Sequence, residues 1–303
     1  MTALSGNEVK RLGKRLRDGL RTATDLDVLD AYRSEFDPIL LDTAHTINAL
    51  LHAEVTYIMA GRIKRTKSII RKLARERNSG MDLSRMSDLV GLRVVVRTLR
   101  DQDRALDLLR EKLPLIREPY DYRTREYGYR AIHVVSGTPS HRVEIQLRTI
   151  AQHFWADASE TLGEQAKEGV TTEKEERYLR GLFTVACAAD HGVVDFTNGE
   201  KEHDFGVAAL DRLTALFDRV TGHPEHGRGG SYVLVYQRAS NLLIRVDEFA
   251  STERVEAIDH YRRMYRLMDE TEYDILVLNS PSQEALAVTH PRYFPEANVV
   301  KQN

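Results

Sequence analysis

The chain has 303 residues, 42% of them hydrophobic, and a formal net charge of −2, which indicates a globular protein with a sizeable core and limits any anion-binding surface to a local one. The single cysteine, Cys187, excludes an intramolecular disulfide, and no Cys/His spacing is typical of a zinc site. These features predict a cytoplasmic location. No run of about 18 apolar residues is present, so no membrane span is expected.

A strongly basic segment follows an N-terminal part, residues 1–60, that is expected to be mostly helical. The segment GRIKRTKSIIRKLARER, residues 61–77, holds eight Lys and Arg residues and has helical periodicity. Lys64, Ser68 and Lys72 are spaced four apart, so a helix would align them on one face. So many like charges repel one another unless an anion lies beside them, although a solvated helix face is the simpler alternative.

Two strands with one polar face are expected in the middle of the chain. The segment SDLVGLRVVVRT, residues 87–98, predicts a strand from about Leu92, with Arg93 on the face opposite to Leu92 and Val94. The segment RVEIQLRT, residues 142–149, predicts another strand. Its polar positions alternate with apolar ones and are Arg142, Glu144, Gln146 and Arg148.

The order of elements predicts an α/β (α+β) fold. Between the two strands lie an amphipathic helix at 100–113, a polar aromatic loop at 118–130 and a strand at 131–136, and a helix begins near residue 150. This order indicates a mixed β-sheet with helices packed on one face and a polar active-site face on the other.

The C-terminal quarter is expected to be a small α/β unit. Residues 171–220 have helical character, and TGHPEHGRGG, residues 221–230, is a linker candidate. Three strands and two helices are expected after it. The sequence therefore predicts one domain at 1–220 and a regulatory or interaction domain at 230–303. The alternative is that these strands complete the first domain.

Polar side chains on or beside the expected sheet point to nucleotide chemistry. They are Asp88, Arg93, Tyr129, His133, Glu144 and Gln146. Asp88 and Glu144 suit a hard cation such as Mg²⁺, and the basic segment 62–72 suits a polyphosphate. Together they indicate phosphoryl-type transfer from a nucleotide. Neither a P-loop nor a protein-kinase motif set is present. The alternative is a structural ion-pair network on a one-sided sheet.

Four strings carry a family resemblance: RIKRTKSIIRKL, DLVGLR, GYRAIH and VEIQLRT. In this order, over about residues 50–165, they resemble the synthetase domain of the RelA/SpoT family, the alarmone synthetases. The resemblance implies an ATP-dependent pyrophosphokinase that uses Mg²⁺. Such an enzyme transfers pyrophosphate from ATP to the ribose 3′-hydroxyl of GDP or GTP, makes (p)ppGpp and releases AMP.

The resemblance also implies roles on the donor side. Arg62 and Arg93 would sandwich the adenine, a use that suits the planar guanidinium better than a lysine. Lys64, Ser68 and Lys72 would contact the phosphates of ATP.

On the reaction and acceptor side, Asp88 would hold Mg²⁺, and Glu144 would help hold the metal or act as the base. Gln146 would orient the acceptor. Tyr129 would stack on the acceptor base, and His133 would form a hydrogen bond nearby.

The loop of the acceptor side departs from the family pattern. The pattern D-Y-I-x-x-P-K-x-N-G-Y is shortened to DYRTREYGY at 121–129, where Arg125 is the candidate replacement for the missing lysine. The sequence therefore leaves the identity of the acceptor substrate open. One alternative is a toxin that pyrophosphorylates the 3′-terminal adenosine of tRNA, with residues 230–303 as an in-chain antitoxin or sensor. Another is an inactive nucleotide-binding regulator. A homo-oligomer is also left open, and Arg148 is expected only to anchor the following helix.

Overall fold

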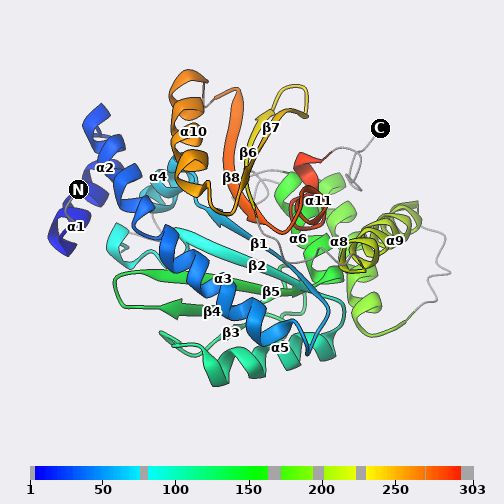
Figure 1. Ribbon diagram of the computed structural model, residues 1–303. Coiled ribbons are helices and arrows are strands. Elements are labelled where there is room, and N and C mark those ends of the chain that lie inside the picture. Colours follow the sequence, from blue (N-terminus) through cyan, green and yellow to red (C-terminus); the bar gives the residue numbers. More distant parts are fainter. Residues whose placement is uncertain are drawn as a thin grey trace.

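The structure is a computed structural model that describes residues 4–75, 81–162, 172–193, 201–222, 230–269 and 271–294. Its strands form one sheet in the order β3-β4-β5-β2-β1-β8-β6-β7 (Figure 1). The strands are β1 (Tyr57–Ile63), β2 (Val90–Val96), β3 (Tyr120–Asp121), β4 (Ile132–Gly137), β5 (Arg142–Thr149), β6 (Gly230–Gln237), β7 (Leu242–Ala250) and β8 (Tyr273–Ser280). β2 and β5 run parallel and the other pairs are antiparallel, so the predicted mixed sheet is confirmed.

Helices surround this sheet and confirm the predicted α/β class. They are α1 (Gly6–Arg17), α2 (Ala23–Ser34), α3 (Asp37–Leu51), α4 (Thr66–Ala74), α5 (Leu99–Lys112), α6 (Ile150–Thr161), α8 (Glu173–Asp190), α9 (Lys201–Thr221), α10 (Arg254–Leu267) and α11 (Gln283–Thr289). Short 3-10 turns lie at η2 (Leu83–Arg85) and η3 (Pro291–Tyr293). None of the helices in these ranges has the length and apolar character that crossing a bilayer requires.

The basic segment is not one helix from residue 61. The first three residues of the segment, 61–63, are the end of β1, and β1 pairs with β2 along its whole length. Helix α4 begins only at Thr66. β1 lies between β2 and β8 in the sheet, and five of its seven residues are buried, so burial on both faces rather than a helical stripe decides its conformation. Lys64 therefore lies in the connection before α4, and only Ser68 and Lys72 share the helix.

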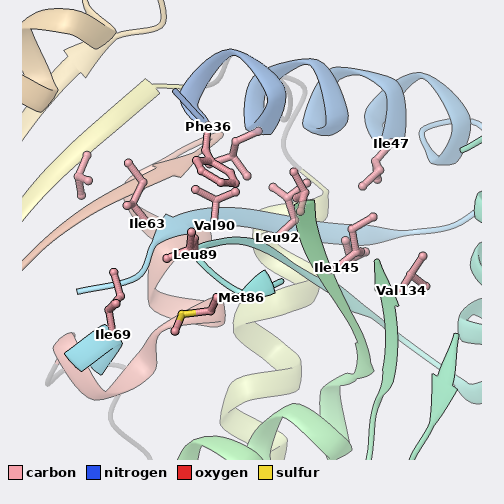
Figure 2. Close-up of a cluster of buried hydrophobic side chains, with 14 of the residues drawn as sticks. Phe36, Ile47, Ile63, Ile69, Met86, Leu89, Val90, Leu92, Val134 and Ile145 are labelled. Atoms are coloured by element: carbon pink, nitrogen blue, oxygen red, sulfur yellow. The ribbon is translucent and has the colours of Figure 1, made fainter. Parts of the chain in front are cut away.

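One face of the sheet is the apolar core beneath α3 and α5. Figure 2 shows Phe36 and Ile47 facing Val90, Leu92 and Ile145, which are all at most 2% exposed. The alternation that the sequence predicted for β2 and β5 places these apolar residues on this face. The polar residues of the same strands consequently point to the other face.

The other face is partly covered as well, so the helices are not confined to one face. Ile58 of β1 and Val95 of β2 pack in a second core with α6, α8, α9 and α11, the group at the right of Figure 1. Because Ile58 and Val95 are apolar, helices can pack over this end of the two strands. The rows of polar residues toward the other end of β2 and β5 are described below.

The C-terminal strands continue the same sheet. β8 pairs with β1 through Asn279 opposite Gly61 and Leu278 opposite Arg62. The described part of residues 230–303 is therefore joined to the rest by strand pairing. The division into domains at 1–220 and 230–303 stays a prediction, and most of the expected linker, residues 223–229, lies outside the described residues.

Candidate functional site

Strand register brings the predicted polar residues into two adjacent rows. The first row crosses β1, β2 and β5 at Arg62, Gly91 and Glu144. The second row contains Arg93, Gln146 and His133 on β2, β5 and β4. Because alternate residues of a strand point to the same face, these side chains share the face opposite α3.

Gly91 leaves open space in the first row. A Cβ atom at this position would lie 3.1 Å from the carbonyl oxygen of Glu144, closer than side chains normally pack. A larger residue would also project between Arg62 and Glu144, its Cα partners on either side. The glycine therefore keeps the surface between these two charged residues accessible.

Asp88 lies just before β2 and holds two lysines. Lys64 Nζ is 2.8 Å from Oδ2, and Lys72 Nζ is 2.8 Å from Oδ1. Burial alone would raise the pKa of Asp88, but the two ammonium groups outweigh it and hold that pKa well below its usual range. Asp88 is therefore an ionised carboxylate, and the predicted cluster of Lys64, Lys72 and Asp88 is assembled despite the later start of α4.

A cavity of about 760 Å³ opens beside this cluster and is strongly basic. Nine cationic side chains line it against three acidic ones, and Ser68 also lies in its wall. The cations are Arg62, Lys64, Arg65, Lys67, Arg71, Lys72, Arg75, Arg238 and Arg292, and the acids are Asp88, Glu160 and Asp274. Such a surplus of positive charge in a concave site suits a polyanion of nucleotide size.

The remaining predicted residues form a closed hydrogen-bonded ring. Arg148 Nη2 donates to the Tyr129 hydroxyl at 2.9 Å and to Gln146 Oε1 at 2.8 Å. Tyr129 Oη is 2.6 Å from His133 Nε2, and His133 Nδ1 is 3.2 Å from Glu144 Oε1. Gln146 Nε2 donates to Glu144 Oε2 at 3.0 Å and closes the ring.

The partners in the ring assign its donors. The Glu144 carboxylate only accepts, so His133 donates through Nδ1–H and accepts the Tyr129 hydroxyl proton at Nε2. Burial raises the pKa of Glu144, but the hydrogen bonds from His133 and Gln146 outweigh it, so this pKa lies below its usual value. Both oxygens of Glu144 are thereby oriented while the group stays ionised.

Asp88 and Glu144 belong to one site. Asp88 precedes β2 and Glu144 lies near the start of the parallel strand β5, so both are at the same end of the strand pair. The charge of Asp88 acts on Glu144 and tends to raise its pKa. No cluster of three or more metal-ligating side chains occurs in the described ranges, but two ionised carboxylates fit Mg²⁺, which completes its shell with water and substrate phosphates.

Among the residues predicted for the donor side, Arg93 is the one that does not line the cavity, although its Nη2 is 3.9 Å from Oε1 of Glu160, which does. Arg93 is 6% exposed, lies under α11 and donates to the carbonyl oxygen of Thr289. Burial and the nearby charge of Arg148 lower the pKa of Arg93 to about 9. The charge of Arg62 also acts on Arg93, and the pairing of these two residues around a base stays a prediction.

Arg125 lies beside the ring rather than in it. Its guanidinium is 4.4 Å from the centre of the Tyr122 ring, and Tyr122 contacts the rings of both Tyr129 and His133. Sequence reasoning missed Tyr122, although it belongs to the same loop motif. It also treated Arg148 only as an anchor, whereas this residue, at 1% exposed, holds two members of the ring.

Comparison with known proteins gives a family match over the centre of the chain. Residues 61–164 match the model described as a region found in RelA/SpoT proteins. We refer to residues 61–164 as the RelA/SpoT region, after the family model that they match. This RelA/SpoT region contains all the site residues that the sequence analysis assigned, including Lys64, Asp88 and Glu144.

Relatives align with the RelA/SpoT region and part of its flanks. The protein Rv1366 of Mycobacterium tuberculosis is 28% identical over 184 residues, which cover 59% of this chain and 66% of that protein. The GTP pyrophosphokinase YjbM of Bacillus subtilis is 30% identical over 122 residues, covering 37% of this chain and 57% of that protein. The chain thus spans just under two thirds of the one relative and over half of the other.

Solved structures are also similar to the chain. The small alarmone synthetase 1 from Bacillus subtilis has 23% identity and a TM-score of 0.44, covering 56% of this chain and 94% of that chain. A GTP pyrophosphokinase family protein from Streptococcus pneumoniae has 20% identity and a TM-score of 0.43, covering 62% of this chain and 98% of that chain.

Proposed function

We propose that this protein is an ATP-dependent pyrophosphokinase that transfers pyrophosphate to the ribose 3′-hydroxyl of GDP or GTP. One observation carries the proposal: a basic cavity around Asp88 lies beside a rigidly oriented, ionised Glu144. The basic cavity suits the triphosphate of ATP, and the ionised Glu144 suits the removal of a proton from a hydroxyl. The RelA/SpoT region and the similarity to the pyrophosphokinase YjbM support the same reaction.

The chain's own residues account for the reaction as follows. The cations of α4 and Lys64 bind the phosphates of ATP and neutralise the charge that develops on them. Glu144 takes the proton of the acceptor 3′-hydroxyl, and the oxygen of that hydroxyl attacks the β-phosphorus of ATP. The bond between that phosphorus and the α–β bridging oxygen breaks, AMP leaves with this oxygen, and the β- and γ-phosphates stay on the acceptor.

Mg²⁺ is the cofactor that this donor set fits. Asp88 and Glu144 would hold it together with phosphate oxygens, and it would supply charge neutralisation of the triphosphate. Lys64 and Lys72, which now pair with Asp88, can turn toward the phosphates when the metal takes the carboxylate.

A second acceptor is favoured by the aromatic surface beside the ring. Tyr120 is 47% exposed, and Arg117 lies 4.5 Å from its ring centre. Tyr120 also stacks on Tyr122, and the guanidinium of Arg125 lies over the Tyr122 ring. Successive aromatic and guanidinium planes suit a strand with more than one base. The 3′-terminal adenosine of tRNA is therefore the second candidate, with the C-terminal segment as its in-chain antitoxin or sensor.

An acceptor panel tests both candidates. The purified full-length chain is incubated with Mg²⁺, ATP labelled in its γ-phosphate, and GDP, GTP, unlabelled ATP or tRNA in separate reactions. Label on GDP or GTP, with release of AMP, is the result we expect. Label only on tRNA would replace the first candidate by the second. No label on any acceptor, although ATP binds, would identify an inactive nucleotide-binding regulator.

A further inference from the structure

Arg148 is a buried cation whose two terminal nitrogens reach different parts of the structure. It is 1% exposed, and its Nη2 donates to the Tyr129 hydroxyl at 2.9 Å and to Gln146 Oε1 at 2.8 Å. Its Nη1 lies 3.4 Å from Nδ1 of His153 on α6. The Nη2 branch therefore leads toward Glu144 on the polar face of the sheet, and the Nη1 branch leads toward the helices that cover its other end.

This position is electrostatically unfavourable for a residue that only anchors a helix. After the larger effect of burial, the charge of Arg148 lowers the pKa of Arg93, and Nε of Arg148 is buried without a hydrogen-bond partner in the described part of the chain. The acids Glu160 and Asp157 offset part of the cost. Because an apolar side chain would fill the same space without burying a charge, the guanidinium is expected to have a role beyond packing.

The guanidinium can only donate, and this sets the direction of a first chain of hydrogen bonds. The Tyr129 oxygen accepts from Arg148, and burial raises the pKa of Tyr129, so the hydroxyl keeps its proton. That proton is directed to His133 Nε2 at 2.6 Å, which leaves the proton of the imidazole on Nδ1. The Nδ1–H group then donates to Oε1 of Glu144 at 3.2 Å.

The same nitrogen of Arg148 sets the direction of a second chain. Gln146 turns its Oε1 to Nη2 of Arg148 and therefore its amide nitrogen to Oε2 of Glu144, at 3.0 Å. A reversed amide would place nitrogen against the guanidinium and oxygen against the carboxylate, so both contacts would be repulsive. Each oxygen of Glu144 thus accepts one directed hydrogen bond, and a carboxylate, with about four lone-pair sites, keeps others for substrate.

We propose that Arg148 is a positioning residue for the transfer reaction, because its Nη2 fixes both hydrogen-bond chains that orient the two oxygens of Glu144. The inference rests on the proposed function, in which Glu144 takes the proton of the acceptor hydroxyl. Arg148 acts on Glu144 through intervening side chains. It also gives His133 and Gln146 a role on Glu144 in addition to the acceptor contacts expected from the sequence.

Arg148→Met tests this role, because methionine fills much of the same space but donates no hydrogen bond. AMP release is measured with Mg²⁺ and saturating ATP and GDP, ATP affinity by calorimetry, and folding by thermal unfolding. We expect kcat to fall about 30- to 100-fold while the affinity for ATP changes less than about 3-fold. Arg148→Lys, which keeps a charged donor, should recover at least about 10-fold of the loss.

His153→Leu is the matched control, because it removes the partner of the other terminal nitrogen of Arg148. It also removes the contact of 2.8 Å between His153 Nε2 and the carbonyl oxygen of Val288 on α11. We expect a lower midpoint of thermal unfolding, as in Arg148→Met, but a kcat within about 3-fold of the wild type. An equal loss of kcat in the two variants would show that Arg148 acts only through packing and would overturn the assignment.

A double-mutant cycle with Glu144→Gln shows whether Arg148 acts through Glu144. If it does, adding Arg148→Met to Glu144→Gln lowers the residual rate of AMP release less than about 3-fold. A further loss as large as that in the wild-type background would overturn the assignment.

The two chains can also be cut with Arg148 in place, which decides the matter if Arg148→Met does not fold. The double variant Tyr129→Phe, Gln146→Met should lose kcat about 30- to 100-fold, as expected for Arg148→Met. Wild-type turnover together with an unchanged kcat in this double variant contradicts only the role of Arg148. A wild type that releases no AMP with GDP or GTP contradicts the proposed function, and this inference with it.

Discussion

At the scale of single residues, the acceptor side depends on a closed ring of hydrogen bonds among five side chains, Tyr129, His133, Glu144, Gln146 and Arg148. Arg148 is 1% exposed and charged, and it reaches Glu144 only through Tyr129, His133 and Gln146. Burial lowers the pKa of Arg148, but the Tyr129 hydroxyl and nearby acids raise it more. Loss of one member therefore leaves a buried donor or acceptor unpaired, which is more costly than the loss of an exposed hydrogen bond.

Tyr129→Phe tests this ring. The change removes the hydroxyl that donates to His133 and accepts from Arg148, so we expect the free energy of unfolding to fall by about 1–3 kcal/mol. Denaturant titration measures this loss. Tyr127→Phe is the matched control, because Tyr127 is 43% exposed, and its effect should stay within about 0.5 kcal/mol. Equal effects of the two changes would show that the ring adds nothing to stability.

Much of the site could be predicted from the sequence, because the residues concerned lie in short motifs whose strand alternation fixes the face. Glu144 and Gln146 on β5 and Arg93 on β2 follow that rule, and Asp88 lies next to the start of β2. The burial of Arg93 could not be predicted, since it is caused by Thr289, nearly 200 residues later in the chain.

At the scale of elements, α6 and α11 enclose a group of charged side chains between them and the sheet. Asp157 of α6 is 4% exposed, and burial raises its pKa to about 6 in spite of nearby arginines. The carboxyl therefore binds its proton more tightly in the folded chain than in the unfolded chain. Its contribution to stability is largest at low pH and is lost as the pH rises from about 4 to 6.

Asp157→Asn removes this dependence, because the amide resembles the protonated acid at every pH. Relative to the wild type, the free energy of unfolding of the variant should increase by up to about 3 kcal/mol between pH 4 and pH 7. Thermal or denaturant unfolding across this range measures it. Asp211→Asn, at an exposed position of α9, serves as the control and should show no such trend. A difference that stays constant with pH would contradict the raised pKa.

Element types were predictable, but their neighbours were not. Alternation in the segments of β2 and β5 and an apolar run in that of β6 identify strands, whereas the pairing of β8 with β1 is a contact between residues more than 200 positions apart. The basic segment misled for a related reason: its charges continue from β1 through the connection into α4, so composition does not reveal where the strand ends.

At the scale of the whole molecule, one sheet organises both sides of the proposed reaction. The cation-lined cavity occupies the space between α4, β1 and β8, and the ring around Glu144 lies on β4 and β5 beyond β2. The core under α3 also includes Val235 and Val277 from the C-terminal strands. The donor cavity and the acceptor ring are therefore held by the same packed structure, with Asp88 and Glu144 where they meet.

Release of AMP by Glu144→Gln tests this arrangement most directly. With ATP, Mg²⁺ and the acceptor that the panel identifies, we expect the variant to form AMP at least about 100-fold more slowly than the wild type. Its affinity for ATP should change less than about 3-fold, because the phosphates are bound by Lys64 and α4. Normal turnover by the variant would contradict the role of Glu144 and, with it, the proposed mechanism.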